Sequence, residues 1–179
     1  MNLPVIALIM LVAGSAFARQ DETPPKAQPV AYFDVLDLPA RIDEPRLQKA
    51  EGNYVLNCAL ANRSEQPLVG LRMTLIFVDA NGRISHLTWN EATTVPAYSI
   101  KSFAFNPPVK GDPKDAKVFL GIDEVIGRET VWRTVDADKL LRAYARGQHG
   151  MVPKVQTVQN KYDREVPRVI SVLPPRPKP

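Results

Sequence analysis

The sequence has 179 residues, of which 45% are hydrophobic and 23% are charged, so it predicts one globular domain with flanking segments. Cys58 is the only cysteine, which excludes an intrachain disulfide framework. The formal net charge is +4, and the basic excess lies near the carboxyl end, because residues 133–179 hold ten Lys and Arg against four Asp and Glu.

Residues 1–18 contain no charged side chain and end in Ala16-Phe17-Ala18, a small-x-small pattern of the kind that signal peptidase cleaves. The alternative is an uncleaved anchor, but Pro4 and Gly14 interrupt an apolar run shorter than the roughly 20 residues that span a bilayer. The sequence therefore predicts a signal peptide cleaved near Ala18 and export to the periplasm or the extracellular space. We expect no transmembrane segment in the mature chain, and a flexible proline-rich linker at residues 19–30.

Between residues 31 and 135, apolar and polar residues alternate with a period close to two, which is typical of half-buried strands. Residues 39–53, "PARIDEPRLQKAEGN", are rich in turn formers and are expected to be a connection. The predicted fold is an all-β, antiparallel sandwich of the immunoglobulin or fibronectin-III type with about seven strands. The expected strands lie at 32–37, 54–61, 68–78, 83–89, 98–105, 117–126 and 129–135.

One short helix is expected at residues 136–147. Asp136 can cap its start, Leu140, Leu141 and Tyr144 share a stripe, and Gly147 can end it. Such a short helix is not stable alone, so we expect it to dock on the sandwich. Residues 148–179 are expected to be a basic, proline-rich tail with two weakly strand-like runs, "KVQTVQ" and "PRVISVL". If truncation unfolded the domain, these runs would be structural strands.

The motifs with a possible chemical role favour structure over catalysis. Counting from Asp79, a calcium loop would need an oxygen ligand at its fifth position, where Arg83 stands, so "DANG" predicts a hairpin turn. His86, His149 and Cys58 are too few for a zinc site, and alternation places Cys58 inward as an inert thiol. We expect no cofactor, no metal and no catalytic residue. A hydrolase would need one of the histidines joined to a carboxylate and a hydroxyl.

Candidate binding residues fall into two groups. Trp89, Trp132 and Tyr98 are candidates for stacking on sugar rings, although burial of the two tryptophans in the core is the favoured interpretation. The tail predicts contacts with anionic surfaces, whereas export and the lack of interleaved aromatic residues beyond Tyr162 argue against nucleic acid. Asn62-Arg63-Ser64 fits the N-glycosylation sequon. The basic residues expected to contact anionic surfaces are Lys154, Lys161, Arg164, Arg168, Arg176 and Lys178.

Residues 54–105 resemble the FxLYD group of small exported sandwiches. The similarity lies in a strand followed by Asn-x-Ser, a long strand that runs into aspartate and a glycine turn, and a late Phe-x-Phe. Here these features are "ALANRSEQPLVGLRMTLIFVDANGRI" and "SFAF". The resemblance implies an immunoglobulin-like fold in an envelope or extracellular setting, and it brings no catalytic residues.

Together these observations predict an exported, non-enzymatic binding or scaffold module of the cell envelope. Its partner would be a protein or an anionic envelope polymer. The first alternative is a carbohydrate-binding module that uses exposed aromatic residues, and the second is a hydrolase with an unrecognised site.

Overall fold

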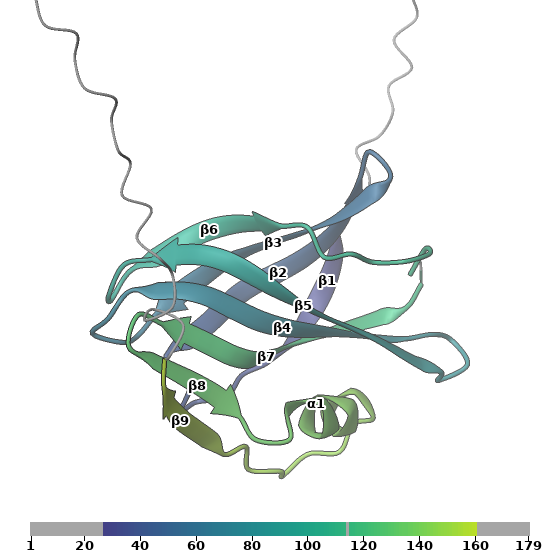
Figure 1. Ribbon diagram of the computed structural model, residues 1–179. Coiled ribbons are helices and arrows are strands. Elements are labelled where there is room, and N and C mark those ends of the chain that lie inside the picture. Colours follow the sequence, from purple (N-terminus) through teal and green to yellow (C-terminus); the bar gives the residue numbers. More distant parts are fainter. Residues whose placement is uncertain (1–26, 114, 161–179) are drawn as a thin grey trace, which may run out of the picture.

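The computed structural model describes residues 27–113 and 115–160, which form nine β-strands and one α-helix (Figure 1). The predicted signal peptide, linker residues 19–26 and tail residues 161–179 lie outside the described residues. The elements are β1 (Gln28–Phe33), β2 (Ala40–Ala50), β3 (Asn53–Asn62), β4 (Leu68–Val78), β5 (Ile84–Val95), β6 (Ile100–Phe105), β7 (Lys117–Gly127), β8 (Thr130–Thr134), α1 (Ala137–Ala145) and β9 (Val155–Gln159).

The strands form a curled mixed sheet in the order β5-β4-β7-β1-β2-β3-β6, with β8 on the edge of β7 and β9 on β8 (Figure 1). The mostly β composition predicted from the sequence is confirmed, but the expectation of about seven antiparallel strands is wrong. There are nine strands, and β1 runs parallel to β7 through residues 30–33. Residues 28 and 29 of β1 instead pair with β2, so this one strand joins the two halves of the sheet.

Two strands lie in segments where the sequence predicted none of the seven strands: β2 in the predicted connection and β9 in the predicted tail. β2 occupies the segment expected to be turn-rich, because buried Ile42 and Leu47 alternate with exposed charged residues. A register shift between Asp43 and Arg46, with Glu44 at φ 47°, accommodates Pro45 inside the strand and hides the period of two. β9 lies within the segment expected to be a tail, and it pairs along all of β8.

The core fills the inside of the curl. Leu71, Met73, Leu75 and Phe77 of β4 all face it and are buried, which confirms the register predicted from alternation. Cys58 is also buried, and burial raises the pKa of its thiol to about 12, as expected for an inert cysteine.

Helix α1 covers the outer face of β4 and β7, as the docking prediction required. Leu141 lies against the backbone of β7, where a Cβ at Gly121 would be 3.1 Å from the leucine Cδ2. Tyr144 packs its ring 5.1 Å from that of Phe33. Asp136 precedes the helix with φ 55° and makes no capping bond, so the predicted side-chain cap is wrong.

The other turn predictions are confirmed. Asp79 Oδ1 accepts hydrogen bonds from the backbone N–H groups of Asn81 and Arg83, both at 2.8 Å. These bonds satisfy two backbone donors in the turn of the β4–β5 hairpin. Gly82 and Gly147 have φ of 74° and 75°, and Gly147 follows the last turn of α1. Among the described residues, no helix has the length and apolar character needed to cross a bilayer.

Candidate functional site

Four loops meet at one end of the sheet, at the left of Figure 1. They are residues 34–39, 63–67, 96–99 and 128–129, and we call them, with Asn160, the loop end. Backbone hydrogen bonds join the first three loops in a row, and the N–H of Glu129 in the fourth donates to the side chain of Gln66 at 3.0 Å. The N–H of Arg63 donates to Pro39 O at 2.6 Å, and the N–H of Tyr98 donates to Ser64 O at 3.2 Å. The N–H of Asn160 donates to Glu129 O at 2.7 Å, so the described chain ends at the same place.

The side chain of Asn62 ties three segments of the loop end together. Its Nδ2 donates to the carbonyl oxygens of Gln66 at 2.9 Å, Val95 at 3.2 Å and Pro96 at 2.9 Å. Its Oδ1 accepts from the backbone N–H and the hydroxyl of Ser64. Asn62 is 3% exposed. A glycan attached to Nδ2 would disrupt the hydrogen bonds that this amide donates. In the folded chain the sequon is therefore a structural motif.

The loop end exposes apolar side chains. Of the six large hydrophobic side chains that are exposed among the described residues, four lie on these loops or on the first residues of the strands that leave them. They are Leu36 at 79%, Tyr98 at 73%, Ile100 at 68% and Val69 at 40%. Tyr98 also has φ 51°, a left-handed backbone conformation that is unfavourable for an aromatic residue. The hydrogen bond from the Tyr98 N–H to Ser64 O therefore helps to hold this backbone conformation.

An open depression of about 420 Å³ lies beside Tyr98 and Ile100. Its polar lining includes Arg63, which is exposed, and Arg41, whose Nε lies 2.8 Å from the carboxylate of Asp43. The site thus combines an aromatic ring, an aliphatic side chain and guanidinium groups. This set can bind apolar and anionic groups, but it holds no nucleophile–base pair.

The structure separates the three aromatic residues that the sequence singled out. Trp89 is 8% exposed and belongs to the core, and its Nε1 donates to Glu91 Oε1 at 2.9 Å. Trp132 is half-buried against the core. Tyr98 alone of the three is largely exposed. Of the predicted basic contacts, Lys154 is exposed just before β9, and Lys161, Arg164, Arg168, Arg176 and Lys178 lie outside the described residues.

Sequence reasoning missed Leu36, and it identified Asn62 only as part of a glycosylation sequon. Leu36 stands in the apolar run "VLDL", where neighbouring Val35 and Leu38 are buried, so hydropathy does not distinguish it. For Asn62, the Asn-x-Ser spacing was a usable signal, because such residues often satisfy turn backbones.

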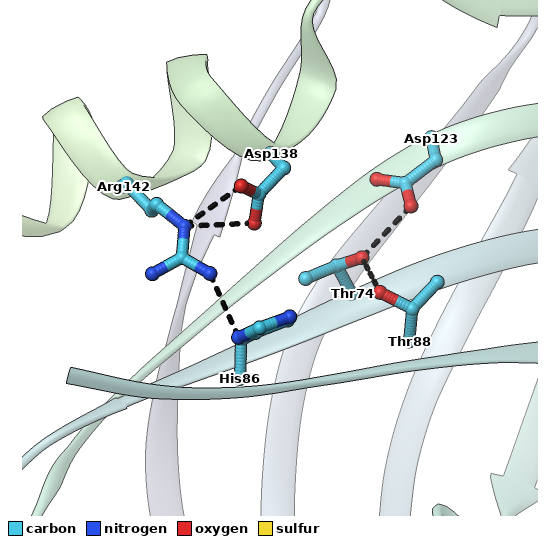
Figure 2. A network of polar contacts seen from close by, with 6 residues as sticks. All are labelled: Thr74, His86, Thr88, Asp123, Asp138 and Arg142. Atoms are coloured by element: carbon cyan, nitrogen blue, oxygen red, sulfur yellow. Dashed lines mark hydrogen bonds and ion pairs between the residues drawn. The ribbon is translucent and has the colours of Figure 1, made fainter.

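A second cluster of polar side chains lies between α1 and the sheet (Figure 2). Arg142 donates through Nη2 to Nδ1 of His86 at 2.7 Å and pairs through Nε with Asp138. Beside it, the Thr74 hydroxyl donates to Asp123 Oδ2 at 2.8 Å and shares a 2.7 Å hydrogen bond with Thr88. Arg142 and His86 therefore join α1 to β5, and Thr74, Thr88 and Asp123 join β4, β5 and β7 to one another.

This cluster is not arranged as a hydrolytic triad. A triad places the imidazole between a carboxylate and a nucleophilic hydroxyl, whereas here the imidazole of His86 accepts from Arg142 and Asp123 accepts from Thr74. Burial raises the pKa of Asp123, and the hydrogen bond from Thr74 opposes that shift. His149 contacts the ring of Tyr144, 6.2 Å between centroids. In the described part of the chain, no group of His, Cys, Asp and Glu is placed to hold a metal ion.

A third region lies at the opposite end of the sheet. The Tyr54 hydroxyl donates to Asp112 Oδ1 at 2.7 Å, and Lys49 Nζ lies 3.1 Å from Oδ2 of the same carboxylate. These groups line an open depression of about 450 Å³ that also includes Leu47. Because the polar groups there bond to one another, the depression is a weaker candidate for binding than the loop end.

Comparison of the chain with protein-family models, with curated proteins and with solved structures finds no significant match. The geometry of the loop end is therefore the main indication of function.

Proposed function

We propose that this protein is an exported, non-enzymatic binding module of the cell envelope, and that it contacts its partner through the loop end. The observation that carries the proposal is the exposure of Leu36, Tyr98 and Ile100 at the loop end. Exposed apolar patches of this kind mark interaction sites on soluble domains.

The rigidity of the loop end supports a binding role. Asn62 and the bonds between loops hold Tyr98 and Ile100 in place before any partner arrives, so little conformational entropy is lost on association. An exposed tyrosine with positive φ costs folding free energy and gains no core contact in return. Tyrosine is also enriched at protein interfaces.

We further propose an immunoglobulin-like sandwich of the FxLYD type for the fold. Antiparallel pairing of β2, β3 and β6 in one half of the sheet and of β5, β4 and β7 in the other supports it, since sandwich domains are built from antiparallel strands. The Asn62–Ser64 turn, on which the resemblance partly rests, has a structural role that agrees with it. The apolar amino-terminal segment supports the exported setting.

The carbohydrate-binding alternative keeps one supporting observation, the 73% exposure of Tyr98. It is less favoured because a single aromatic ring, with Trp89 in the core, forms no extended platform. Soluble envelope glycans that compete for binding would favour this alternative.

The test is capture of partners from envelope fractions by the mature protein and by two matched variants. Tyr98→Ser removes the exposed ring at the loop end. Val152→Ser is the control, because Val152 is 83% exposed and lies away from the loop end, before β9. We expect capture to be lost with Tyr98→Ser and kept with Val152→Ser. Equal capture by both variants would contradict the proposed site.

A further inference from the structure

We infer that the protein forms a symmetric dimer in which the free edge of β5 pairs antiparallel with the same edge of a second copy. This surface lies outside the loop end, so the inference goes beyond the proposed function. Three features of β5 lead to it: the direction of its backbone groups, its composition and the register that its free edge allows.

One side of β5 has no partner strand among the described residues. β5 is the first strand of the sheet and pairs only with β4. The N–H of Asp79 donates to Arg83 O at 3.1 Å, which starts the β4–β5 ladder with a hydrogen-bonded pair. Such pairs recur at every second residue of an antiparallel ladder, so the odd-numbered residues of β5 bond to β4. The backbone N–H and C=O groups of the even-numbered residues therefore point away from β4. These residues, which we call the β5 edge, are Ile84, His86, Thr88, Asn90 and Ala92.

The β5 edge lacks the features that protect exposed strand edges from pairing. Edge strands are commonly blunted by lysine, proline, bulges or short length. β5 has twelve residues, contains no Lys, Arg or Pro, and keeps an unbroken register with β4 from Ile84 to Ala92. Ile84 is half-buried, and the other residues of the β5 edge are exposed. An edge of this kind is a template for a further strand.

The other two free edges in the described part of the chain are less suited to pairing. β6 has six residues, and its exposed Lys101 donates through Nζ to Thr94 O at 3.2 Å. β9 has five residues. The β5 edge therefore offers the longest row of unpaired backbone groups.

The β5 edge is self-complementary, which favours a second copy of this chain as its partner. Two antiparallel copies can bond all the residues of the β5 edge in only one register. In that register Thr88 lies on the two-fold axis and faces the partner's Thr88, and His86 faces the partner's Asn90. The β5 edge carries no carboxylate and no Lys or Arg, so no like charges meet along it.

The core side of β5 agrees with the same register. It places half-buried Leu87 beside the partner's Trp89, a residue that is 8% exposed. Cross-strand contacts of aromatic side chains stabilise antiparallel sheets. Glu91, the only carboxylate of β5, faces the partner's Ser85. The pairing thus covers apolar surface and brings no two carboxylates together.

The dimer places the two loop ends at opposite ends of one continuous sheet. β5 leads directly into the loop of residues 96–99, so antiparallel pairing directs the two copies of this loop away from each other. A dimer that binds through both loop ends would bridge two partner molecules.

The first experiment measures the mass of the mature protein over a range of concentrations by analytical ultracentrifugation. We expect a monomer–dimer equilibrium. Asn90→Pro removes an outward N–H and keeps the bonds to β4, and it should weaken dimerisation at least about tenfold, because both copies lose a hydrogen bond. The matched control is Ser102→Pro on β6. The N–H of Asn62 donates to Ser99 O, so by the same alternation the N–H of Ser102 points away from β3. Ser102→Pro should leave the equilibrium unchanged.

Opposite charges at residue 88 test the register. Thr88→Lys and Thr88→Glu each place like charges face to face on the two-fold axis, so each variant alone should dimerise roughly fivefold more weakly. Their equimolar mixture should dimerise more tightly than either variant alone, because a lysine then faces a glutamate. Thr88 is exposed and Thr74 keeps Asp123 as its acceptor, so we expect both variants to fold, with thermal midpoints as the check.

Amide hydrogen exchange followed by NMR gives a readout without any substitution. As the protein concentration rises, the N–H groups of His86, Thr88 and Asn90 should become protected, while that of Ser102 stays unprotected.

Four results would each overturn the inference. They are a wild type that stays monomeric at every concentration, a dimer that Asn90→Pro leaves unchanged, a mixture of the residue-88 variants that dimerises no better than either alone, and a dimer in which the β5 edge gains no protection. Protection of the β5 edge by an extended segment of another protein, with the wild type monomeric, would also overturn it.

Discussion

Replacing Asn62 with alanine removes the side chain that ties three segments of the loop end. The substitution removes the amide donor of the carbonyl oxygens of Gln66, Val95 and Pro96. It also removes Oδ1 as the acceptor of the N–H and the hydroxyl of Ser64, although the hydroxyl keeps Gln66 O as an acceptor at 2.9 Å. The bond to Val95 is buried, whereas the other four are part-buried and accessible to replacement by water.

The expected loss follows from that difference. An unsatisfied buried carbonyl costs about 1–3 kcal/mol, and we assign about 0.5 kcal/mol to each part-buried bond that water replaces. We therefore expect Asn62→Ala to lower the free energy of unfolding by about 3–5 kcal/mol. Asn62→Asp should lose at least as much, because it removes the donors and places a negative charge against three carbonyl oxygens.

Denaturant unfolding followed by tryptophan fluorescence measures the loss, since Trp89 lies in the core. The matched control is Asn57→Ala on the same strand, where the side chain is exposed and the change should be within about 0.5 kcal/mol. If Asn62→Ala also falls within that range, the side chain does not hold the loops. The rigidity invoked for the loop end would then be wrong.

Three further predictions concern the core, the polar cluster and the carboxyl end. Leu75→Ala should lower the free energy of unfolding by about 2–5 kcal/mol in denaturant titrations, because the fully buried side chain leaves a cavity; an unchanged midpoint would contradict its place in the core. The pKa of Asp123 is raised in the folded state, so its contribution to stability falls as pH rises from about 4 through the raised pKa. Asp123→Asn should remove that fall, and unfolding titrations in which variant and wild type differ equally at every pH would refute the assignment. Deletion from Met151 onward removes β9 and should lower the thermal midpoint, whereas truncation after Asn160 should leave it unchanged; equal midpoints for the two would show that β9 adds no stability.

The sequence correctly predicted the strands in which apolar and polar residues alternate regularly. It did not predict, or predicted only weakly, the strands in which a bulge, a proline or polar residues interrupt that alternation. β4 was placed correctly because its inward residues are apolar and turn formers bound it on both sides. β2 was missed because a bulge and Pro45 break the period, and its outer positions are charged. β9 was expected only as a weakly strand-like run, because Gln and Thr fill most of its positions and it is held as a strand by pairing with β8. The change of partner within β1 depends on contacts between distant segments, which local patterns do not encode.

The candidate site was predicted only in part, for a related reason. Tyr98 was a candidate because an aromatic residue beside turn formers is visible in the sequence. That Leu36, Tyr98 and the chain exit at Asn160 share one end follows from bonds between four loops that are far apart in sequence. The role of Asn62 likewise depends on Val95 and Pro96, more than thirty residues away.

The position of β1 has a mechanical consequence. The strand begins beside Ala116, at the start of β7, while Asn160 is bonded to Gly127 at the end of β7. A pull between the two ends of the described chain would therefore load the parallel β1–β7 ladder in series with the β8–β9 ladder, since Asn160 directly follows β9. The hydrogen bonds of the β1–β7 ladder would be sheared together, instead of being opened one after another. A domain built this way resists extension between its termini more strongly than its equilibrium stability alone would indicate.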